Sequence, residues 1–298
     1  MLFSVKLGYT LMKKMPRVLV ILNSLISIFL LIFLLVGCYK PNQSSTYLVR
    51  YKFNDDSPLY SVISKQFSSK PSTKGLEKVN ILSGYMGVCI DNIPSNYYKN
   101  ATDKASTVCF NRKKVDDMQI YDDLTIKIFS FGYQNSSKQT DSSDINILGL
   151  AHQNSAEIVH PYILMVVVIF TILLFGITTY AAIPKLPYKD YTQRVLMGLT
   201  ALTAFLWTIG AIWAHVAINA SASLVPRASM NIMKVHKGRK SQTMTWFAFA
   251  FMLINCFIIW MIYFRDRKEL DEKLDDVKSV GNPFSNKYSS DSNTLTSV

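Results

Sequence analysis

The fold of this chain is decided by an apolar run near its start, VLVILNSLISIFLLIFLLV, which occupies residues 18–36. The run has no charged side chain, and its only polar residues are Asn23, Ser24 and Ser27. At 1.5 Å per residue, a helix of this length crosses a hydrocarbon layer of about 30 Å. Three more runs have the same character, at residues 161–183, 195–218 and 244–264. The sequence therefore predicts four transmembrane helices, the first of which covers residues 18–38.

The composition agrees with a membrane protein. Only 17% of the 298 residues are charged, whereas soluble domains carry about 25%. The net charge is +12, but the excess is spread over several segments and forms no single groove. We therefore expect membrane lipids as partners and no nucleic acid.

The first run has an alternative interpretation as a cleaved signal peptide. Lys13, Lys14 and Arg17 precede it, and Leu35-Val36-Gly37-Cys38 is similar to a bacterial lipobox. However, the apolar part of a signal peptide usually has about 7 to 15 residues. The longer run favours an uncleaved first helix.

Basic flanks and glycosylation sequons predict the topology. By the positive-inside rule, Lys and Arg next to the spans place residues 1–17, 184–194 and 265–298 in the cytoplasm. A large segment, 39–160, and a second loop, 219–243, then lie outside. All four N-x-[ST] sequons fall in these outer segments, at Asn42, Asn100, Asn135 and Asn219. The second outer loop departs from the rule, because it is basic from Arg227 to Lys240 and contains no acid there.

The large outer segment has the pattern of an antiparallel sheet. Residues 47–53 alternate between apolar and basic side chains, which is typical of a half-buried strand. Residues 79–82, 85–90 and 124–131 are further candidate strands. Residues 64–74 and 134–144, rich in Ser, Lys, Thr and Gln, are predicted to be mobile loops. The expected fold is a membrane α+β protein, a four-helix bundle with an extracellular antiparallel β-sheet.

Two of the four cysteines, Cys89 and Cys109, lie in this outer segment. An oxidising compartment favours a disulfide between them. The alternative is two free buried thiols. Cys256, inside the fourth run, is expected to pack among apolar side chains.

The segment Gly84-Tyr85-Met86-Gly87-Val88-Cys89, followed by Cys109 and placed between the first two spans, resembles the signature of fungal claudin-like membrane proteins. The four spans, large first outer loop and cytoplasmic tail extend the similarity over most of the chain, most of all to the mating-factor-induced family of budding yeasts. All four Trp lie in or beside the third and fourth spans, unlike the Trp of the animal claudin signature, so no tight-junction role is implied.

The resemblance implies a multi-pass plasma-membrane glycoprotein with cytoplasmic termini. Such a protein would act in low-affinity calcium influx and cell fusion during mating. The alternative is a structural organiser of cortical membrane domains without an ion role. The resemblance implies no cofactor apart from calcium as a transported or regulating ion, and it suggests self-association or a calcium-channel or fusion partner.

The spans argue against a self-contained calcium pore, because none of them contains Asp or Glu, whereas calcium needs several oxygen ligands. The outer pairs Asp55-Asp56, Asp116-Asp117 and Asp122-Asp123 are either a solvated surface or the lining of an oligomeric path. In the third span, a polar stripe that includes His215 is either a packing face or a titrating site.

No motif for catalysis is present, so an enzyme is not expected. In the tail, residues 265–278 have the pattern of an amphipathic helix that continues the fourth span. The polar end contains Asn282-Pro283-Phe284, which resembles the tripeptide bound by endocytic EH-domain adaptors. An Asn-Pro turn would present the Phe to such a partner.

Overall fold

The computed structural model describes residues 2–69, 71, 73–94, 107–111, 120, 123–129, 143–183 and 189–280. Helices and strands follow one another along the chain as α1 Leu2–Leu35, β1 Val49–Phe53, α2 Tyr60–Ser68, β2 Asn80–Ser83, β3 Gly87–Asp91, β4 Val108–Asn111, β5 Thr125–Phe129, β6 Ser143–Asn146, α4 Ile147–Gln153, α5 Pro161–Ala182, α6 Lys189–Ala228, β7 Met233–Lys237 and α7 Arg239–Val280.

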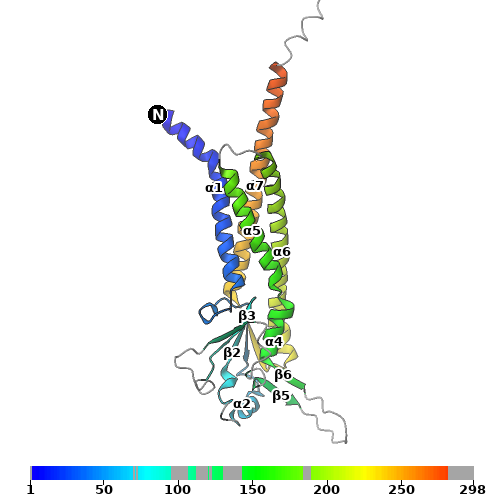
Figure 1. Cartoon of the computed structure of the whole chain (residues 1–298). Coiled ribbons are helices and arrows are strands. Elements are labelled where there is room, and N and C mark those ends of the chain that lie inside the picture. The colour runs from blue at the N-terminus through cyan, green and yellow to red at the C-terminus, as the bar shows by residue number, and fades with distance from the viewer. Residues whose placement is uncertain are drawn as a thin grey trace, which may run out of the picture.

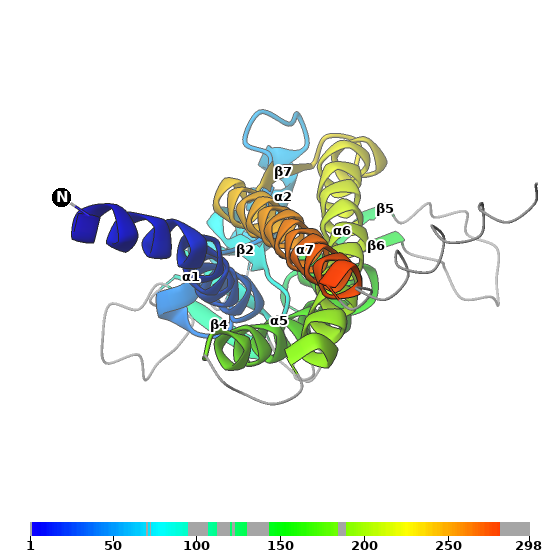
Figure 2. The same ribbon diagram turned by 90° about the horizontal axis from the view of Figure 1, so that it is seen from above.

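Four of these helices form a bundle, and each is long and apolar enough to cross a membrane. The stretches that qualify are Met15–Leu35, Pro161–Ala182, Tyr191–Ala228 and Arg239–Lys268. Helix α1 packs against α5 and α7, and α6 packs against the same two helices (Figures 1 and 2). The described chain therefore has the architecture of a multi-pass membrane protein. Helix α7 continues beyond the bundle on the side away from the sheet (Figure 1), as the charge pattern of residues 265–278 predicts.

A five-stranded antiparallel sheet lies at the other end of the bundle, with strand order β4-β3-β2-β1-β7 (Figure 1). Strand β1 alternates as predicted: Val49, Tyr51 and Phe53 are buried, while Arg50 and Lys52 on the opposite face are partly exposed. A separate hairpin pairs β5 with β6. The α+β fold class is confirmed.

Sheet and bundle share one hydrophobic core, which runs from Tyr51 and Ile81 in the sheet to Val167 and Trp207 in the helices. Buried polar contacts join the same parts: Asn154, after α4, donates Nδ2 to the Tyr51 hydroxyl at 2.8 Å. Burial raises the pKa of Tyr51 to about 12, although Asn154 and Ser221 bond to its side chain. The continuous core fixes the sheet relative to the helix bundle.

The prediction of a mobile loop at 64–74 is wrong in part. Residues 64–68 belong to α2, where Ile63 and Phe67, four positions apart, bury one helix face. Of the other predicted loop, 134–142 lie outside the described residues, while Ser143 and Asp144 begin β6. The connection at 219–243 contains regular structure that the sequence pattern did not indicate, because α6 continues to Ala228 and β7 then pairs with β1. The polar composition of these segments concealed both elements.

Candidate functional site

The turn between β2 and β3 contains the glycine signature and contacts the segment that follows α1. The Gly84 amide donates to the Gly87 carbonyl at 2.9 Å and closes the turn. A Cβ added at Gly84 would lie 2.4 Å from the Gly37 carbonyl oxygen, and one at Gly87 would lie 2.7 Å from that of Cys38. The glycines therefore allow close contact between two backbones, so that the end of the first span docks on the sheet.

Next to this contact, a disulfide joins Cys89 in β3 to Cys109 in β4, which face each other in the strand register. The free cysteine Cys38 is buried in the same apolar cluster, with Leu82 and Cys89. The signature thus connects the end of the first predicted span with strands β3 and β4, on the side of the sheet next to the bundle.

The outer face of β1 and β7 carries a group of basic side chains that we call the cationic quartet: Arg50, Lys52, Lys234 and His236. In the register Lys52 lies opposite Lys234, and Arg50 lies opposite His236. Like charges in such positions destabilise a strand pair. Burial, followed by the charges of Lys52, Arg50 and Lys234, lowers the pKa of His236. The quartet is therefore an electropositive surface suited to anionic groups.

Two carboxylates partly neutralise the quartet. Asp55 lies 3.5 Å from the Lys52 ammonium, and Asp56 lies 3.5 Å from that of Lys234. Arg50 instead donates to the Tyr47 hydroxyl at 2.7 Å and lies over its ring. Since each of these two aspartates faces a lysine, they are poorly placed as calcium ligands. Within the described parts of the chain, no cluster of three His, Cys, Asp or Glu side chains could hold a metal ion.

Inside the bundle, polar side chains connect helices. Asn255 of α7 donates Nδ2 to the Ser24 hydroxyl of α1 at 3.1 Å, and both residues are buried. His215 of α6 packs edge-on against Trp246 of α7, with ring centroids 5.7 Å apart. The contact with Trp246 supports packing as the role of His215 in the predicted polar stripe.

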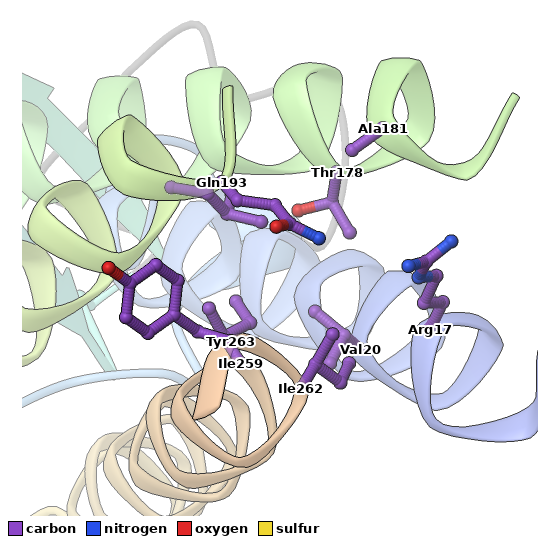
Figure 3. A pocket seen from close by; sticks show the side chains of 9 residues that line it. Arg17, Val20, Thr178, Ala181, Gln193, Ile259, Ile262 and Tyr263 are labelled. Atoms are coloured by element: carbon purple, nitrogen blue, oxygen red, sulfur yellow. The ribbon is translucent and has the colours of Figure 1, made fainter. Parts of the chain in front are cut away.

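At the end of the bundle away from the sheet, three helices meet at Asp266. Its Oδ2 lies 3.2 Å from the Arg17 guanidinium of α1 and accepts a bond of 2.7 Å from Gln193 Nε2 of α6. Arg17 and Gln193 also line a cavity between the helices, together with Val20, Thr178 and Tyr263 among others (Figure 3). The cavity measures about 30 Å³, room for about one water molecule and too little for a larger ligand. This cluster therefore serves to hold helices together.

Comparisons with known proteins identify relatives of this chain. Residues 65–265 match a family described as "Ca2+ regulator and membrane fusion protein Fig1". The chain is also 48% identical over 285 residues to the Factor-induced gene 1 protein of Saccharomyces cerevisiae, a match that covers 95% of each chain. The chain belongs to the Fig1 family. No solved structure matches it.

The Fig1 match begins within α2 and ends one residue before Asp266, so it includes the glycine signature, the disulfide and β7. Of the predicted sequon residues, Asn42 lies in a short 3-10 turn at Pro41–Gln43. Asn219 lies within α6, where its Nδ2 donates to the His215 carbonyl and its Oδ1 accepts from Lys237. The other two sequon residues, Asn100 and Asn135, and the tail motif Asn282-Pro283-Phe284 lie outside the described residues.

Sequence reasoning missed two features of this Fig1 family member. The cationic quartet depends on β7, and the only local signal for that strand is the alternation of Met233 and Val235 with basic residues. The Asp266 cluster joins residues 249 positions apart in sequence, and no local pattern identifies such a contact.

Proposed function

We propose that this chain is a plasma-membrane protein that regulates calcium entry and supports membrane fusion between mating cells. The observation that carries the proposal is the 48% identity to the Factor-induced gene 1 protein over 95% of both chains. The family description, a Ca2+ regulator and membrane fusion protein, points in the same direction. A claudin-like plan, with a sheet docked on four helices, fits this role.

We infer a regulator of calcium entry in preference to a pore formed by this chain alone. The four apolar runs contain no acid, and Asp266, at the end of the bundle away from the sheet, is already bound to Arg17 and Gln193. The outer face of β1 and β7 is basic, which repels divalent cations. A partner channel, or an oligomer, would supply the oxygen ligands that calcium needs.

The proposed orientation places both termini in the cytoplasm and the sheet outside the cell. Basic residues at the ends of the spans and the four sequons in the outer segments support it. In this orientation the tail motif Asn282-Pro283-Phe284 would be accessible to EH-domain adaptors, which would remove the protein from the surface.

The test is calcium uptake in cells exposed to mating factor, with and without this protein, together with calcium flux into liposomes that contain only the purified chain. We expect calcium uptake by the cells to fall when the protein is absent. We expect the liposomes to remain impermeable to calcium. Unchanged uptake in its absence would contradict the proposed function. A calcium flux in liposomes that is lost in Asp55→Asn and Asp56→Asn variants would contradict the role as a regulator.

A further inference from the structure

The turn between α6 and β7 holds a methionine in an unusual backbone conformation. The Asn231 amide donates to the Pro226 carbonyl at 2.7 Å, and the Met230 amide donates to the Arg227 carbonyl at 3.3 Å. These two bonds define a Schellman motif, in which the position of Met230 is usually glycine. Met230 has φ 52°, a left-handed conformation that is unfavourable for a residue with a Cβ. We call Arg227–Asn231 the Met230 turn.

The Met230 turn is fixed by the surrounding structure. Asn54, at the end of β1, donates its side-chain amide to the Asn231 carbonyl at 2.9 Å and its backbone amide to the Ile232 carbonyl at 2.8 Å. The Ser229 hydroxyl accepts from the Met233 amide at 3.2 Å. Ile232 itself is buried. The turn therefore presents Met230 in one defined orientation.

The Met230 side chain is 67% exposed, and Leu224 on the preceding helical turns is 60% exposed. Contacts with the described part of the protein therefore do little to offset the strain at Met230. The predicted span ends at residue 218, and the helix continues to Ala228, which adds about 15 Å at 1.5 Å per residue. The yellow end of α6 accordingly lies beside the sheet (Figure 1). Leu224 and Met230 therefore lie beyond the end of the predicted span at residue 218.

The charge around the Met230 turn favours an anionic surface as its partner. Between residues 219 and 240 the chain carries Arg227, Lys234, Lys237, Arg239 and Lys240 and no acid. Arg227 and Lys234 are exposed, but Lys234 is paired with Asp56 at 3.5 Å, so the net positive charge comes from the other basic residues. A second copy of the chain would bring these like charges together, which disfavours self-association through this edge. Basic residues around an exposed apolar side chain match the headgroup and acyl layers of an anionic bilayer.

We propose that the Met230 turn binds an anionic phospholipid bilayer opposite the one that holds the four helices, with Met230 entering its headgroup layer. This inference rests on the proposed role in membrane fusion. It names Met230 as the residue that contacts the opposing bilayer. The basic residues attract the opposing surface, and the fixed turn places an apolar side chain against it.

The test uses the full-length protein in liposomes of phosphatidylcholine, mixed with protein-free vesicles that contain phosphatidylserine. Docking is measured by co-flotation of the two populations. Met230→Gly fits the left-handed position, so its melting temperature should be unchanged or higher, whereas docking should weaken about tenfold with the loss of a buried side chain. Met230→Leu should retain docking. Val62→Ser, which removes an apolar side chain with 59% exposure from α2, is the matched control and should dock normally.

Normal docking by Met230→Gly would overturn the inference, as would equal docking to vesicles of phosphatidylcholine alone. In mating cells, Met230→Gly should reduce fusion and leave calcium uptake at the normal level. A loss of both would contradict a specific role in membrane contact. If removal of the whole protein changed neither fusion nor calcium uptake, the proposed function itself would fail, whatever the variant does in liposomes.

Discussion

Replacing Gly87 with alanine tests whether the glycine signature joins the sheet to the first span. A Cβ at this position would lie 2.5 Å from the Phe110 carbonyl oxygen and 2.7 Å from the Cys38 carbonyl oxygen. Both atoms belong to the backbone, and they approach from different segments, β4 and the chain after α1. Neither can move aside by a change of rotamer, so the added methyl group must displace one segment.

Overpacking of this kind costs about 1 to 3 kcal/mol, and contact with two backbone atoms places Gly87→Ala toward the upper end. At about 2 to 4 °C per kcal/mol, a cost of about 2 to 3 kcal/mol should lower the melting temperature of the purified protein in detergent by about 4 to 12 °C. Gly176→Ala is the matched control, since a Cβ at Gly176 in α5 meets nothing within 4 Å. Its melting temperature should be unchanged or slightly higher, because alanine favours a helix.

A Gly87→Ala protein that melts at the wild-type temperature would refute this account of the signature. Equal losses in Gly87→Ala and Gly176→Ala would also refute it, because the effect would then follow from any added methyl group. Calcium uptake measured at equal surface levels would show whether the junction acts only through stability.

Three further predictions concern other parts of the molecule. Cys109→Ser should lower the free energy of unfolding by about 3 kcal/mol, because the disulfide closes a loop with a separation of 20 residues; a wild-type melting temperature would contradict this. Asp266→Asn removes the charge that faces Arg17 and should cost about 2 kcal/mol, whereas the exposed Asp271→Asn control should not alter melting. Because the pKa of His236 is lowered from 6.5, the unfolded chain binds more protons as the pH falls. The free energy of unfolding is therefore highest above about pH 6.5 and decreases as the pH falls below it. His236→Gln should reduce this decrease, as measured in melting curves.

Much of the fold could be predicted because its signals are local. The four apolar runs, the alternation in β1 and the continuation of α7 follow from the periodicity of neighbouring side chains. Strand β7 could not be found in this way, because three of its five residues are basic and its partner β1 lies far away in the sequence. Helix α2 was missed for a related reason: only Ile63 and Phe67 are buried in it, and the polar side chains around them are typical of a loop.

The sequence by itself determined that the chain has four segments long and apolar enough to cross a membrane, since hydrophobic length is a property of continuous segments. It also placed the glycine signature and the two cysteines between the first two spans. The tertiary structure decided what those residues do, because their function depends on contacts between distant segments. Gly87 matters because Cys38 and Phe110 approach it, and the cationic quartet exists because β7 pairs with β1. Met230 is exposed because α6 continues past the predicted span and ends in a fixed turn.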